Sequence, residues 1–129
     1  MSASANGVPR ALLVVGALSG ALAVAAGAFG AHALAASVSP ERLATFRTGA
    51  SYHLIHALAT VAVALVAAHV PGRVVRAAGW LFVAGTVLFA GSLYLLVLLD
   101  VPMLGAVTPL GGVAFIAGWL ALAYGALKG

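Results

Sequence analysis

Residues 77–99 read AAGWLFVAGTVLFAGSLYLLVLL, without a single formal charge. An α-helix needs about 20 apolar residues to cross the hydrocarbon core of a bilayer, so these residues span it once and are too few to span it twice. The strands of a membrane β-barrel alternate polar and apolar positions, and this stretch does not. A helix in lipid also satisfies its own backbone hydrogen bonds. The stretch therefore predicts a transmembrane helix.

Three more charge-free intervals flank this one, at 11–40, 48–72 and 101–127. Charged residues make up only 6% of the 129 residues and hydrophobic residues 64%. A soluble domain carries about 25% charged residues, and disordered chains are poor in apolar ones, so both classes are excluded. We predict one all-α membrane domain over residues 1–129, an antiparallel bundle of four transmembrane helices. The predicted spans are about 11–34, 48–69, 77–99 and 109–127.

Turn and capping residues set the ends of these helices. The run Ser39-Pro40-Glu41 is typical of a helix start, with Ser39 as the N-cap. This helix is predicted to continue without a break to about His69, so that its first two turns form an amphipathic segment in the membrane interface. The run Pro71-Gly72 ends it, and Asp100-Val101-Pro102 closes the third helix. The pair Thr108-Pro109 opens the fourth in the same way as Ser39-Pro40.

Basic residues near the span ends predict the orientation. Four crossings place Arg10, Arg73, Arg76 and Lys128 on one side, whereas the other side holds only Arg42 and Arg47. The positive-inside rule then favours cytoplasmic N- and C-termini in a cell (inner) membrane. The first span could also be read as a signal peptide cleaved after 31–33, but its apolar core is longer than the 7–15 residues of a signal sequence.

Glycine is abundant inside the spans, where small residues let helix backbones approach closely. One group lies in the first span and one in the fourth, at spacings that keep each group near one helix face: Gly16, Gly20, Gly27, Gly111, Gly118 and Gly125. These positions predict packing inside the bundle or between copies. Four small helices leave little interior, so we expect a homo-oligomer or a subunit of a larger membrane complex.

Polar side chains within the spans are costly in lipid and are therefore candidates for function. Antiparallel packing would bring seven of them toward one leaflet, the non-cytoplasmic one: His32, Tyr52, His53, His56, Tyr94, Asp100 and Thr108. They could hydrogen-bond within the protein and lock the bundle, bind a small molecule or lipid, or, through His32, His53 and His56, bind a metal or haem. The chain has no cysteine and no clustered basic stripe, so thiolate chemistry and nucleic-acid binding are unsupported.

Four blocks resemble, in order, the small YgdD/YwdK family of inner-membrane proteins, whose eukaryotic relatives are called transmembrane protein 256. The blocks are GAFGAHAL at 27–34, TGASYHLIHALA at 48–59, GTVLFAGSLY at 85–94 and TPLGGVAFIAGW at 108–119. The resemblance implies a multi-pass membrane protein with a domain of unknown function. It implies no activity.

Together these observations favour a structural or accessory membrane protein that associates with itself or with other subunits. Its partner is the lipid bilayer, and no catalytic residue, cofactor or resident metal is expected. The first alternative is a protein that binds a small molecule or lipid, with a role related to transport, through the His and Tyr side chains. The second is a metal- or haem-dependent enzyme.

Overall fold

The computed structural model describes residues 7–129 as four long helices joined by short connections. They are α2 (Arg10–His32), α3 (Pro40–Ala67), α4 (Arg73–Leu99) and α5 (Thr108–Lys128). The 3₁₀ turns η1 (Leu34–Ala36) and η2 (Pro102–Ala106) lie in two of the connections. All four helices are long and apolar enough to cross a membrane. The prediction of an all-α, four-span membrane protein is confirmed.

The helix ends follow local chemistry. The Ser39 hydroxyl accepts a hydrogen bond from the backbone N–H of Arg42 at 3.2 Å, and Pro40 occupies the first turn of α3. Gly72 has φ +106°, a conformation that glycine adopts without steric cost, and α4 starts directly after it, earlier than the predicted 77. Asp100 closes α4 in the left-handed conformation, with φ 55°.

The start of α5 differs from the prediction. Thr108 is the first residue of the helix, and no side chain caps it. Its hydroxyl lies 2.6 Å from the hydroxyl of Ser92 on α4. Thr108 therefore connects α5 to α4 instead of capping α5, because the Ser92 hydroxyl of α4 lies beside the start of α5.

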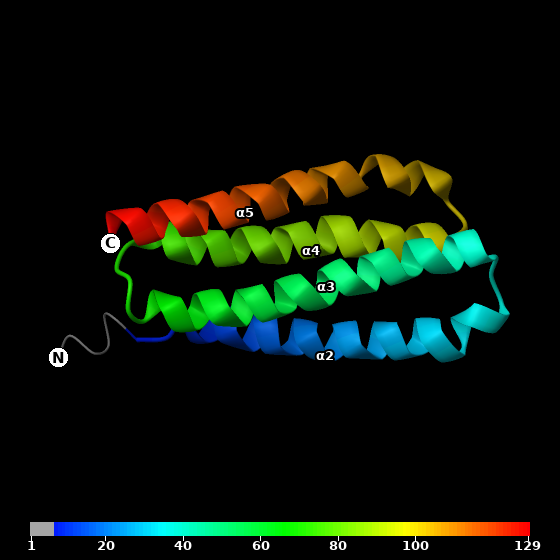
Figure 1. Cartoon of the computed structure of the whole chain (residues 1–129), viewed down its shortest axis with the longest axis horizontal. Helices are drawn as coiled ribbons and strands as arrows, with labels where there is room; N and C mark the ends of the chain where they lie inside the picture. The colour runs from blue at the N-terminus through cyan, green and yellow to red at the C-terminus, as the bar shows by residue number, and fades with distance from the viewer. Residues whose placement is uncertain (1–6) are drawn as a thin grey trace.

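The helices lie side by side in chain order, each antiparallel to the next (Figure 1). In this view α5 and α2 form the two edges, and the start of α2 and the end of α5 lie at the same end of the molecule. The inner helix α3 has half of its most apolar window buried, against 17% for α2. The edge helices consequently leave most of their surface to lipid or to other proteins.

Phenylalanine rings of one helix pack on glycines of the other where α4 meets α5. A Cβ on Gly118 would lie 2.6 Å from the ring of Phe82, and one on Gly111 would lie against the backbone of Phe89. Gly125 faces Val75 in the same way. The absence of side chains at these three glycines permits the close contact between α4 and α5.

The glycines of α2 behave differently from one another. Gly16 packs on α3, where a Cβ would lie 3.1 Å from the Thr60 side chain. Gly20 has only the Cβ of Ala57 nearby, at 3.9 Å, and Gly27 faces open space. Gly27 therefore contributes nothing to packing within the chain.

Candidate functional site

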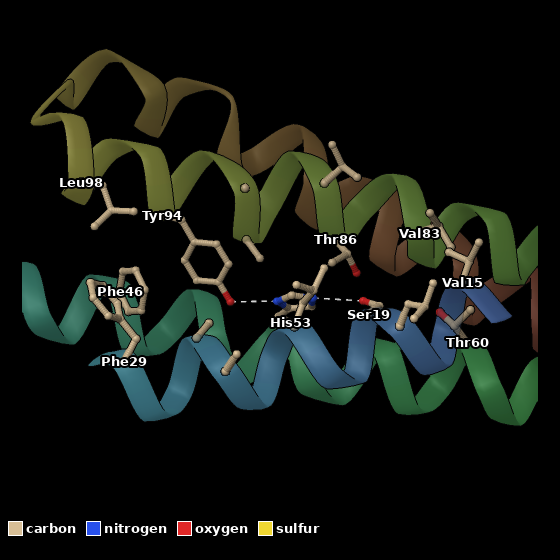
Figure 2. A pocket seen from close by; sticks show the side chains of 17 residues that line it. Val15, Ser19, Phe29, Phe46, His53, Thr60, Val83, Thr86, Tyr94 and Leu98 are labelled. Carbon is tan, nitrogen blue, oxygen red and sulfur yellow. Dashed lines mark hydrogen bonds between the residues drawn. The ribbon is translucent and has the colours of Figure 1, made fainter. Parts of the chain in front are cut away.

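An apolar groove of about 750 Å³ runs between α2 and α4, with α3 as its floor (Figure 2). It extends from Val15 and Val83 at one end to Phe29 and Leu98 at the other. Beyond the first end, the side chain of Leu12 packs on Gly79, so that α2 and α4 are in direct contact there. The groove begins where the two helices diverge.

The groove opens sideways. Its rim carries side chains that remain well exposed, among them Leu18 (61%), Leu22 (64%) and Val87 (66%). These residues lie within spanning helices, so the medium at the opening is the hydrocarbon of the bilayer. A molecule would enter this groove from lipid.

Three polar side chains, joined by two hydrogen bonds, cross the groove. The Nδ1 atom of His53 lies 2.9 Å from the hydroxyl of Tyr94, and its Nε2 atom lies 3.0 Å from the hydroxyl of Ser19. Figure 2 shows the imidazole between the two hydroxyls, so that α2, α3 and α4 each supply one member. We call Ser19, His53 and Tyr94 the groove triad. His53 itself is only 7% exposed.

His56 occupies a closed aromatic cluster on the side of α3 that faces α5. Its Nδ1–H donates to the Tyr52 carbonyl at 2.9 Å, and its Nε2 accepts from the indole N–H of Trp119 at 3.1 Å. The ring stacks on Phe115, with centroids 3.5 Å apart. Both nitrogens are satisfied, and the partners define one neutral tautomer because a carbonyl only accepts and an indole N–H only donates. This arrangement suits a structural role.

Tyr52 lies at the edge of the same aromatic cluster. Its ring packs against Phe89 with centroids 4.7 Å apart, and 43% of the residue remains exposed. Tyr52 therefore belongs to the aromatic cluster around His56 and not to the groove triad.

The structure does not bring the other predicted polar residues to the histidines. His32 is exposed at the end of α2. Asp100 pairs with Arg42 at 3.7 Å, and the guanidinium of Arg42 also donates to the carbonyl of Val97. Thr108 is bonded to Ser92, as described above. The expected single cluster is therefore divided among several places.

The height of the histidines also differs from the expectation. His53 meets Ser19, and His56 meets Trp119, near the middle of α2 and α5 respectively. The predicted span covers 48–69, with the turns from Pro40 in the interface; over the whole length of α3, Pro40–Ala67, the two histidines lie near the middle. His53 and His56 consequently lie at mid-height of the helices, whereas His32, Asp100 and Thr108 lie at the end of the bundle opposite the start of α2.

The metal or haem alternative finds no matching geometry. Among residues 7–129 no group of three His, Cys, Asp or Glu side chains is close enough to hold a metal ion. His53 and His56 use all four ring nitrogens for other partners, and they face different sides of α3. His32 lies apart from both.

Two hydrogen-bond partners of the histidines, Ser19 and Trp119, were not among the predicted site residues, although the position of each in the sequence indicates a polar contact. Ser19 is a hydroxyl in the middle of an otherwise apolar span, which marks it as a polar group that needs a partner. Trp119 lies in the middle of α5, whereas tryptophans of membrane proteins prefer the water interfaces. A tryptophan at mid-span indicates an internal acceptor for its N–H.

Comparisons with known proteins agree with the membrane fold. Residues 26–112 match a family model described as protein of unknown function, DUF423. The UPF0382 membrane protein YwdK of Bacillus subtilis is 45% identical over 92% of this chain and 98% of its own length. UPF0382 membrane proteins of Staphylococcus aureus and Staphylococcus epidermidis are 39% and 40% identical, each over 92% of this chain and 97% of theirs. No solved structure matches.

Proposed function

Since this chain belongs to the DUF423 family of multi-pass membrane proteins of unknown function, in agreement with the resemblance noted in its sequence, we propose a function on the basis of the groove between α2 and α4. The protein binds a long apolar molecule that enters from the bilayer between α2 and α4. The observation that supports this proposal is an apolar groove that opens to lipid and is crossed by the groove triad.

The dimensions of the groove support this proposal. Its volume of about 750 Å³ lies within the range of about 300–1,000 Å³ that is usual for small-molecule sites. Along α2 it runs from Val15 to Phe29, a helical rise of about 21 Å. The hydrocarbon core is about 30 Å thick, so a lipid-like chain fits along the groove in its normal orientation in the membrane.

Gly91 provides a direct test. It lines the groove, and a Cβ built on it meets nothing within 4 Å, so Gly91→Leu places a side chain into the groove without a clash at its root. Gly112 has equally open surroundings but does not line the groove, and Gly112→Leu is the matched control. The measurement is native mass spectrometry of each purified protein titrated with hexadecane.

We expect the original protein and Gly112→Leu to bind one hexadecane at saturation. In Gly91→Leu the bound fraction falls at least tenfold, because the leucine occupies the same space. Equal binding in both variants, or no saturable binding in any of the three proteins, would refute the proposed function.

The proposed role is binding without a reaction. His56 is enclosed among Tyr52, Phe115 and Trp119, and the groove triad holds neither a carboxylate nor a thiol. No relative among those compared carries the name of an enzyme. We therefore assign the protein no catalytic residue.

Self-association is the second candidate function, and the surface of α2 favours it. The exposed positions of this edge helix include many small residues, namely Ala17, Ala21, Gly27, Ala28 and Ala31. The exposed face of α5 instead carries large side chains such as Leu110, Val113 and Ile116. Small residues let helices approach closely in lipid, so α2 is the edge that suits a second copy.

Cysteine crosslinking in native membranes tests this second candidate. The chain has no cysteine of its own, so Ala21→Cys and Ala28→Cys each introduce one defined thiol. We expect both to form disulfide-linked dimers under mild oxidation, whereas Val113→Cys on α5 stays monomeric. Equal dimer yields for α2 and α5 would contradict an interface at α2.

A further inference from the structure

The groove triad contains one more hydrogen than it can use internally. The Tyr94 hydroxyl, the neutral imidazole of His53 and the Ser19 hydroxyl carry one polar hydrogen each, and two hydrogen bonds join the three groups. No other hydrogen-bond partner of these three side chains is present within residues 7–129. One donor at an end of the triad is therefore left over.

The tautomer of His53 decides which end keeps this donor. If Nε2 carries the hydrogen, it donates to Ser19, and Tyr94 donates to Nδ1, so that the serine hydrogen is left over. If Nδ1 carries the hydrogen, Ser19 donates to Nε2, and the Tyr94 hydroxyl is left over. His56 has no such choice, since a carbonyl and an indole N–H define its tautomer.

The two ends are not equivalent. A serine in a helix can turn its hydroxyl toward a backbone carbonyl of the preceding turn, so its hydrogen has a local acceptor within reach. The phenol of Tyr94 stands at the end of a long side chain, away from its own backbone, and it points into an apolar groove (Figure 2). A donor without an acceptor is costly in such surroundings. The Tyr94 hydrogen lacks an acceptor only in the Nδ1–H tautomer, so a molecule in the groove that supplies this acceptor favours that tautomer.

We propose that the occupant of the groove is a long-chain molecule with a carbonyl oxygen that accepts a hydrogen bond from the Tyr94 hydroxyl. Ser19 then donates to Nε2 of His53, and Nδ1–H donates to the Tyr94 oxygen, so that all three bonds run in one direction toward the ligand. This inference rests on the proposed groove function and adds the chemical class of the ligand. A lipid ester and a prenylated quinone both carry such a carbonyl.

Two matched pairs of probes test the inference and separate these sources. Methyl palmitate is compared with hexadecane, and a prenylated naphthoquinone with the corresponding prenylated naphthalene. For at least one pair we expect the carbonyl compound to bind about two- to tenfold more tightly, as one net hydrogen bond provides. The carbonyl stretching band of the bound probe moves to lower wavenumber.

Tyr94→Phe removes the donor and keeps the ring. In this variant the carbonyl advantage and the infrared shift disappear, so that each carbonyl compound and its hydrocarbon partner bind with similar affinity. In Ser19→Ala both effects persist, because the Nδ1–H tautomer still leaves the Tyr94 hydrogen free.

The outcomes distinguish the two proposals. If no probe of either pair binds, the proposed groove function fails. If hydrocarbons bind but neither carbonyl compound binds more tightly, or if Tyr94→Phe keeps the infrared shift, the groove function stands and the carbonyl inference is refuted.

Discussion

At the scale of single residues, the two central histidines have opposite environments although they are three positions apart. His56 is enclosed by aromatic rings, with both nitrogens bonded to groups whose donor or acceptor role cannot change. His53 lies beside a groove between two hydroxyls, each of which can donate or accept. The first arrangement suits stability, and the second suits recognition.

This difference predicts that His56→Leu destabilises the fold. The substitution leaves the Trp119 N–H without an acceptor in an apolar site, which costs about 1–3 kcal/mol in the free energy of unfolding. Unfolding in mixed detergent micelles measures it. The control is His69→Leu, at an exposed position just beyond the end of α3, which should change stability little.

A double variant sharpens this test. His56→Leu combined with Trp119→Phe removes both partners of the bond, so no N–H is left unpaired, and the double variant should lose less than the sum of the two single losses. Strict additivity would mean that the bond between His56 and Trp119 contributes nothing to stability.

At the scale of helices, two adjacent glycines of α5 have different surroundings. On α5, Gly111 faces the backbone of α4, where a Cβ would lie 2.8 Å from the Gly85 carbonyl oxygen, whereas Gly112 faces open space. The heptad spacing from Gly111 to Gly118 and Gly125 identifies one helix face. The structure adds which helix that face packs on.

We predict that Gly111→Ala and Gly112→Ala have unlike effects on stability. At Gly111 the new methyl group meets backbone atoms that cannot turn away, so α5 must move from α4 at a cost of about 1–3 kcal/mol. At Gly112 the alanine meets nothing and changes stability by less than about 1 kcal/mol. Equal losses in a detergent unfolding assay would argue against the close contact between α4 and α5.

At the scale of the whole molecule, the row of helices explains why both a groove and a free edge exist. Because α2 stands at one edge and diverges from α4, one side of it lines the groove and another side faces outward (Figure 1). The ligand binding and the self-association that we propose would therefore use different surfaces of the same helix.

The basic residues at one end of the bundle support a prediction of its orientation in the membrane. The start of α2 and the end of α5 lie at one end of the molecule, together with the start of α4, which carries Arg73 and Arg76. We propose that this end is cytoplasmic in a cell (inner) membrane, since basic residues are retained on that side. Alkaline phosphatase fused at Gly129 should be inactive and green fluorescent protein at the same site fluorescent. The reverse pattern would invert the orientation.

The sequence alone predicted the membrane class, the four spans and the family. The membrane class and the spans follow from composition along one helix, because lipid requires apolar side chains and complete backbone hydrogen bonding from every span separately. The family follows from the resemblance of four sequence blocks. Ser39, Pro40 and Asp100 marked helix ends for the same local reason.

Tertiary structure alone decided which polar groups meet. The sequence named His53 and Tyr94 but placed His32, Asp100 and Thr108 with them, and it overlooked Ser19 and Trp119. Side-chain partners in a helical membrane protein depend on the rotation and relative height of whole helices. A one-turn shift of α2 along α3 moves Ser19 about 5 Å from His53 and breaks the triad, while every span stays equally apolar. Apolar periodicity cannot specify that height; the packing of Gly16 on α3 and of Leu12 on Gly79 sets it.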